Sequence, residues 1–172
     1  MTRAYPVPSP GATALGGAVG GAVGGAAALV VLSVGGLLAG HRAVAGANAV
    51  GAWLVRWLQS AAPDAIEHFY WDATLGGVVV AVAAAGLLGA VFALVLARLP
   101  HDHPLAWGVL VAVVAWFALR SAVGPALDPV LVRVFDWRVL LPACMAYGLV
   151  VGGWVHLGRR TAAGVVRRAD RA

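Results

Sequence analysis

Residues 75–96, LGGVVVAVAAAGLLGAVFALVL, run from end to end without a charged side chain. An α-helix rises 1.5 Å per residue, so about 20 apolar residues cross the hydrocarbon core of a bilayer. This stretch therefore predicts a transmembrane helix. The whole chain agrees, because 62% of its 172 residues are hydrophobic and 11% are charged, against about 45–50% and about 25% in soluble domains. The composition excludes a soluble globular domain, a disordered tail and a coiled coil.

Three further stretches are long and apolar enough to cross a membrane, and they cover residues 14–40, 105–122 and 139–157. We predict an all-α, polytopic membrane protein with four transmembrane helices in one domain over 12–158. Residues 1–11 hold three prolines and no periodic pattern, which predicts an extended N-terminal arm. We expect Arg159 and Arg160 to end the fourth helix, so that residues 159–172 form a basic cytoplasmic tail.

Residues 43–60, between the first two spans, show a different pattern. One apolar stripe recurs at helical spacing, and it consists of Val50, Trp53, Leu54, Trp57 and Leu58, whereas Asn48, Arg56 and Gln59 lie off it. Tryptophan and arginine on one amphipathic helix are typical of the membrane interface. We therefore predict an interfacial helix that places Trp53 and Trp57 among the lipid headgroups. Two alternatives stay open: the segment crosses the membrane as a fifth span, or the small residues at 43–47 mark a signal-peptide cleavage site.

The arginines predict an orientation. An even number of spans puts both termini and the turn at 98–104 on one side, together with Arg3, Arg98 and the arginines of the tail. The opposite side receives Arg42, Arg56, Arg133 and Arg138, with most of the acidic residues. The positive-inside rule then predicts a multi-pass protein of the bacterial inner membrane with both termini in the cytoplasm. The basic residues have no fold to present them to nucleic acid, so we expect no such partner.

The clearest local motif is GGAVGGAVGG at residues 16–25. Its glycines form two neighbouring rows at i, i+4 spacing on one helix, and the rows are Gly16, Gly20, Gly24 and Gly17, Gly21, Gly25. Gly148 and Gly152 repeat the spacing in the fourth span. Faces without side chains let two helices approach closely, which drives helix association in lipid. The pattern predicts helix packing, either within this chain or against another protein.

Polar residues that could carry chemistry are few. His101 and His103 flank Asp102, and His156 lies on the same predicted side, but two histidines in a turn do not complete a metal site. We therefore predict no metal or cofactor and name these histidines only as weak metal candidates. Arg120 is the single charge within a predicted span, a few residues before Gly124-Pro125, which we expect to end that span. We predict headgroup contacts for Arg120, Arg159 and Arg160, and we expect bound lipid.

Residues 75–155 resemble a family of small four-helix bacterial inner-membrane proteins of unknown function. The resemblance lies in a third helix that contains tryptophan and ends at a Pro-x-x-x-Pro corner, here Pro125 and Pro129. It also lies in a last helix with Tyr147-Gly148 followed by small residues. The resemblance implies the four-helix architecture and no activity.

These observations favour a function without catalysis. We predict an accessory or scaffold subunit of a larger respiratory, photosynthetic or transport complex, with other integral membrane subunits and membrane lipids as partners. The basis is the small size, the lack of a catalytic motif and a glycine surface larger than one bundle needs. The alternative is an autonomous small oligomeric transporter or channel. A membrane enzyme or redox carrier that uses the three histidines is a third hypothesis.

Overall fold

The computed structural model describes residues 9–60, 63–98, 103–127 and 129–169. Within these ranges the chain is all-helical and contains no strand. The long helices are α1 (Pro10–Leu38), α4 (Trp71–Leu96), α5 (Pro104–Ala118) and α8 (Trp137–Ala169). Four helical stretches are long and apolar enough to cross a membrane, and they are Pro10–Leu38, Trp71–Leu96, Pro104–Ala122 and Trp137–Leu157. The prediction of an all-α chain with four such helices is confirmed.

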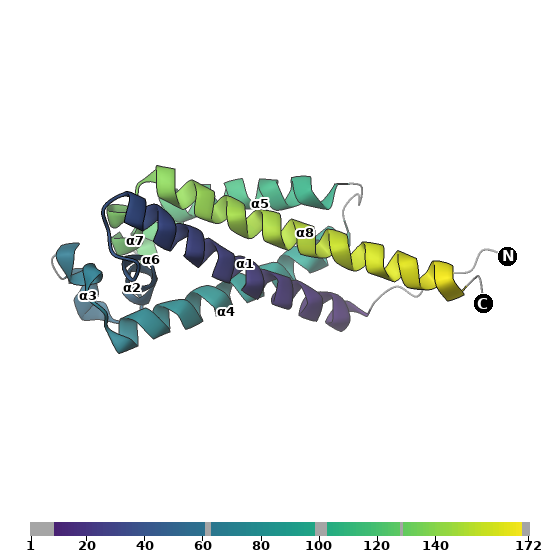
Figure 1. Ribbon diagram of the computed structural model, residues 1–172, viewed down its shortest axis with the longest axis horizontal. Helices are drawn as coiled ribbons and strands as arrows, with labels where there is room; N and C mark the ends of the chain where they lie inside the picture. Colours follow the sequence, from purple (N-terminus) through teal and green to yellow (C-terminus); the bar gives the residue numbers. More distant parts are fainter. Residues whose placement is uncertain (1–8, 61–62, 99–102, 128, 170–172) are drawn as a thin grey trace.

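The long helices follow one another in the spatial order α4, α1, α8 and α5 (Figure 1). Helix α1 packs against both α4 and α8, and α5 packs against α8. Helices α4 and α5 are neighbours in the sequence but do not pack along each other. They therefore form the two outer members of the bundle.

Figure 1 also shows that the two ends of the bundle differ. The start of α1, the end of α8 and the facing ends of α4 and α5 lie at one end, which we call the terminal end. The opposite loop end carries the short elements α2 (Ala45–Gly51), α3 (Arg56–Ser60), η1 (Pro63–Glu67), α6 (Gly124–Leu127) and α7 (Pro129–Val134). This arrangement is the one expected of four antiparallel crossings.

Helix α1 has well-defined signals at both ends. The Ser9 hydroxyl accepts a hydrogen bond from the backbone N–H of Ala12 at 3.2 Å, and Pro10 occupies the first turn, where its missing N–H is not needed. The helix therefore begins before residue 12, earlier than predicted. It ends at Leu38, and two residues later Gly40 has a φ of +91°. Together with the bond from the His41 N–H to the Gly36 carbonyl, this left-handed residue forms a Schellman motif.

The apolar stretches of the third and fourth helices end at Ala122 and Leu157, as predicted, but the helical backbone continues past both ends. Helix α8 does not stop at Arg159 and Arg160 but continues to Ala169, although its apolar part ends at Leu157 as predicted. Gly124-Pro125 does not end the third helix, because the chain continues through a π-helix, η2 (Leu119–Val123), into α6. The proline has no N–H for a regular α-helical bond, and a wider π turn upstream accommodates such a local mismatch without ending the helix.

The single amphipathic helix predicted for residues 43–60 is wrong. The segment forms α2 and α3 with a turn between them, and neither is long enough to span a membrane. Small residues decide which face is buried: a side chain on Gly51 would collide with the Ala73 backbone, and one on Gly77 with the Ala47 carbonyl. Helix α2 thus lies directly on the start of α4. Of the predicted apolar stripe, Leu58 alone is fully buried.

Asn48, which the stripe placed on the polar side, is fully buried and anchors the loop end. Its Nδ2 donates to the backbone carbonyls of Ile66 at 2.8 Å and His68 at 2.6 Å. Its Oδ1 accepts from the Thr74 hydroxyl at 2.6 Å. A buried amide is tolerated because its hydrogen-bonding groups are paired, and these three bonds tie α2 to η1 and α4.

Glu67 forms a second tie at the same end. Its carboxylate accepts from the backbone N–H of Arg42 at 2.5 Å and lies 2.7 Å from His41 Nδ1. Burial pushes the pKa of Glu67 upward, but the Arg42 N–H and the His41 side chain outweigh it, so that the pKa is lowered. Glu67 therefore holds the α1–α2 connection against η1 in its ionised form.

Candidate functional site

The two glycine rows of α1 contact two different helices of the same chain. Gly17, Gly21 and Gly25 face α4, where a side chain on Gly21 would overlap the Ala85 carbonyl. Gly20 and Gly24 face α8, with Trp154 and Tyr147 as their respective neighbours. Gly16 has nothing within 4 Å of the position a Cβ would occupy. Five of the six predicted packing glycines are thus used inside the described bundle.

The contact between α5 and α8 follows the same principle. Gly148 and Gly152 face the backbone of α5, where Gly108 lies directly opposite, and Ala112 and Pro104 extend the contact. Gly108 was missed in the sequence analysis. Its signal is the i, i+4 row of Pro104, Gly108 and Ala112. These contacts correct the premise that the glycine surface exceeds what one bundle needs.

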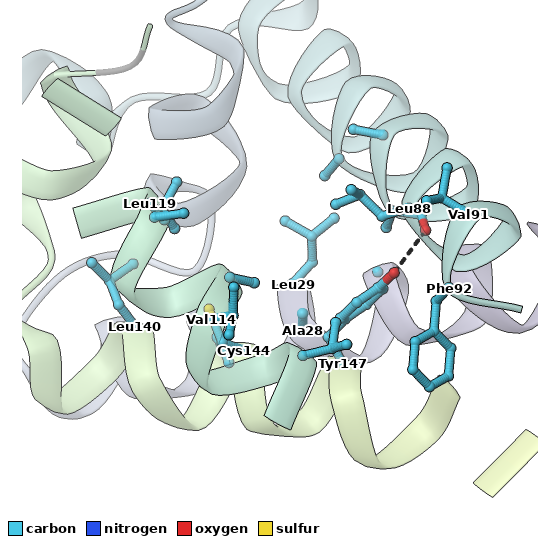
Figure 2. A pocket seen from close by; sticks show the side chains of 18 of the residues that line it. Ala28, Leu29, Leu88, Val91, Phe92, Val114, Leu119, Leu140, Cys144 and Tyr147 are labelled. Atoms are coloured by element: carbon cyan, nitrogen blue, oxygen red, sulfur yellow. Dashed lines mark hydrogen bonds between the residues drawn. The ribbon is translucent and has the colours of Figure 1, made fainter. Parts of the chain in front are cut away.

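A cleft lies between α4 and α5. It has a volume of about 810 Å³ and extends from Leu96 and Trp107 at the terminal end to Leu119 and Leu131 at the loop end. Figure 2 shows Leu88 on α4 and Val114 on α5 at its sides, with Leu29, Cys144 and Tyr147 contributed by α1 and α8. We call this space the α4/α5 cleft.

The side chains that line the cleft are almost all apolar. Three of the described lining side chains carry a polar atom, and they are Trp107, Cys144 and Tyr147. The Tyr147 hydroxyl already donates to the Ala85 carbonyl at 3.0 Å, the dashed bond in Figure 2. Among the described residues, no Asp, Glu, His, Lys or Arg belongs to the lining. The described lining therefore suits a hydrocarbon.

The cleft opens sideways, away from the bundle. Leu88, Val91, Leu110 and Val114 line it and are each at least half exposed. Gly25, Ala28 and Ala143 line it as well, from α1 and α8. Small residues at the back and bulky ones at the mouth give a groove that a flexible chain can enter from the side.

The predicted headgroup contacts lie at the ends of the molecule. Trp53 and Trp57 are about half exposed at the loop end, with relative exposures of 48% and 49%. Trp57 also packs edge-on against Tyr70. Arg120 is exposed within η2, and it makes no ion pair in the described part of the chain. The carboxylate of Asp136 lies close to Arg138, with 3.9 Å between Asp136 Oδ2 and Arg138 Nε. The side chains of Arg159 and Arg160 lie outside the described part.

The weak metal candidates do not form a described site. His103 is exposed at the start of α5, and His156 is partly buried near the end of the apolar part of α8. His101 lies outside the described residues. Among the residues that are described, no three His, Cys, Asp or Glu side chains are grouped to hold a metal ion.

Comparison with known proteins gives no match to a family model, a curated protein or a solved structure. The resemblance over residues 75–155 therefore stays a prediction.

Proposed function

We propose that the chain is a non-catalytic accessory or scaffold subunit of a larger complex in a bacterial inner membrane, of the respiratory, photosynthetic or transport kind. The observation that carries the proposal is the position of α5, which packs along α8 alone among the long helices. A transmembrane helix with one neighbour leaves most of its surface for lipid or for a second protein. The partner is another integral membrane subunit.

The surface that would receive the partner is the outer stripe of α5. Ala106, Val113 and Phe117 are exposed at i, i+7 and i+11 on the side of α5 that does not line the cleft. The glycine rows are occupied within the chain, so this stripe replaces them as the proposed contact. Packing in lipid comes from close van der Waals contact, which a regular stripe of this kind supports.

The orientation belongs to the same proposal. The terminal end carries Arg98, the long basic continuation of α8 and the start of α1, whereas Asp64, Glu67 and Asp72 belong to the loop end. The positive-inside rule then puts both termini in the cytoplasm.

The alternative of a small transporter or channel gains no support from the described residues. A route for a polar solute needs polar side chains along the bundle, and the α4/α5 cleft is apolar. Thr74, one of the few hydroxyl groups in the long helices, is buried and bonded to Asn48. The redox hypothesis would need the three histidines together, and His101 lies outside the described residues.

The test combines purification from native membranes with site-specific crosslinking. A photo-crosslinking residue at Val113 marks the outer stripe, and one at Leu87, on the exposed side of α4 and outside the cleft, is the matched control. The proposal expects a stoichiometric larger complex in mild detergent and a single protein adduct from Val113 but not from Leu87. A lone small protein or a homo-oligomer, with no adduct from either position, would contradict it.

A further inference from the structure

The α4/α5 cleft is about as long as the hydrocarbon layer of one bilayer leaflet is deep. Its lining runs along α5 from Trp107 to Leu119, which at 1.5 Å per residue is about 18 Å. Half of the roughly 30 Å hydrocarbon core is about 15 Å. The cleft is therefore as long as one leaflet is deep, and it opens to the side where lipid chains lie.

The volume of the cleft decides between two classes of occupant. Over the roughly 18 Å of the cleft, a transmembrane helix about 10 Å across fills on the order of 1,400 Å³. The cleft holds about 810 Å³, which is less than that helix segment needs. A helix of another protein could enter it only after α4 and α5 moved apart, whereas a single hydrocarbon chain fits between them as they stand.

The lining gives the chemistry of the part that enters. The Tyr147 hydroxyl is used by the Ala85 carbonyl, and the remaining side chains apart from Cys144 are apolar or aromatic. A polar group drawn into this space would lose its hydrogen bonds to water without replacement. The entering part is therefore hydrocarbon throughout, and any polar group of the ligand stays at an end.

The charges near the cleft favour the loop end for that polar group. Leu119 lines the cleft next to Arg120 in the sequence, and Leu131 lines it two residues before Arg133. Both arginines are exposed and neither pairs with a carboxylate in the described part of the chain. Arg98 is the corresponding exposed arginine at the terminal end, two residues beyond Leu96. The arginines at the end of α8 begin at Arg159, beyond its apolar part. Among the described arginines next to the cleft lining, two at the loop end therefore outweigh one at the terminal end as a site for phosphate.

We infer that the α4/α5 cleft binds one acyl chain of an anionic phospholipid, with the phosphate at the loop end beside Arg120 and Arg133. This site is independent of the partner proposed above, because the outer stripe of α5 lies on another face. A fixed lipid would fill the gap between the two outer helices, whose side chains otherwise lack contacts on that side.

The experiment uses the purified full-length chain and measures retained lipid by native mass spectrometry. Equimolar phosphatidylglycerol and phosphatidylcholine with identical chains are the probes, after delipidation in detergent. Leu88→Trp places a bulky ring at the cleft, and Leu87→Trp is the matched control. Both leucines are exposed on α4, at 56% and 71%, but Leu88 alone lines the cleft.

The expected result is one retained phosphatidylglycerol in the native chain and in Leu87→Trp, and its loss in Leu88→Trp. Arg120→Gln is expected to lower the preference for phosphatidylglycerol over phosphatidylcholine about fivefold, since an arginine near a lipid surface contributes about 1 kcal/mol. This second variant decides the question if Leu88→Trp fails to fold. Equal lipid retention in the two tryptophan variants, or equal retention of the two lipids by the native chain, would overturn the inference. So would a protein adduct from a crosslinker at Leu88, which would show a helix in the cleft.

Discussion

Adding one methyl group at Gly21 tests how closely α1 and α4 pack. A Cβ at this position would overlap the carbonyl oxygen of Ala85 and come within 2.9 Å of Gly89 Cα. These neighbours are backbone atoms of a continuous helix, so no side-chain rotation can make room. In Gly21→Ala the two helices must therefore separate along their contact.

The magnitude follows from two losses. Overpacking of a close contact costs about 1–3 kcal/mol. The Ala85 carbonyl that must move also accepts the Tyr147 hydroxyl at 3.0 Å, and an interhelical hydrogen bond in a membrane contributes about 0.6 kcal/mol. We expect Gly21→Ala to lower the free energy of unfolding by about 2–4 kcal/mol. Gly16→Ala is the control, because nothing lies within 4 Å of that position, and we expect it to change stability by less than about 1 kcal/mol.

Reversible unfolding of the full chain in mixed detergent and SDS micelles, followed by circular dichroism, measures both variants. The described packing predicts that Gly21→Ala unfolds at a clearly lower SDS fraction than Gly16→Ala. If the two variants unfold together, α1 and α4 are not in backbone contact at Gly21, and the spatial order of the helices is wrong.

Three further perturbations address the loop end and the centre of the bundle. Asn48→Ala leaves two carbonyls and the Thr74 hydroxyl without their buried partner. We therefore expect the free energy of unfolding, measured in the same SDS titration, to fall by about 2–5 kcal/mol. A fall of less than about 0.5 kcal/mol would contradict this role of Asn48. Glu67 has a lowered pKa in the folded chain, so its stabilisation is present above its ordinary pKa of 4.5 and is lost as the pH falls through the folded value. Thermal melts between about pH 3 and about pH 6 should show a fall in stability with falling pH that Glu67→Gln lacks. Tyr147→Phe removes the hydrogen bond from the Tyr147 hydroxyl to the Ala85 carbonyl. We expect the free energy of unfolding to fall by about 0.6 kcal/mol and by at most about 1.7 kcal/mol. A larger fall would mean that the ring itself had moved.

The long helices could be predicted from the sequence because length and apolar composition are local properties. Residues 75–96 are sufficient by themselves to predict a helix long enough to cross a membrane, and α4 ends at Leu96 as predicted. The end of α1 was also close, because Gly40 provides the left-handed residue that a helix end needs. The apolar spans end at Ala122 and Leu157 as predicted. The helical backbone continues past Gly124-Pro125 and past Arg159, because neither a proline nor a charge by itself forces a helix to stop.

The loop end could not be predicted from hydrophobic spacing. A stripe of Val50, Trp53 and Leu54 predicts a buried face only where the hydrophobic effect drives burial, whereas α2 packs through glycine and alanine contacts with α4. The burial of Asn48 depends on carbonyls of Ile66 and His68, which are distant in the sequence. Such pairings become visible only when the fold brings the segments together.

The α4/α5 cleft follows from the same rule of packing between small residues. Gly86 and Gly89 of α4 face α1, while Gly108 and Ala112 of α5 face α8, so the glycines that allow the closest backbone approach are used by other helices. The side chains that remain between α4 and α5 include bulky ones, Leu88, Val91, Leu110 and Val114. In water the hydrophobic effect would drive such residues together, but in a bilayer lipid hydrocarbon covers them equally well. Two helices that are consecutive in the chain can therefore stay apart, and the positions of four small residues determine that the bundle has an open side.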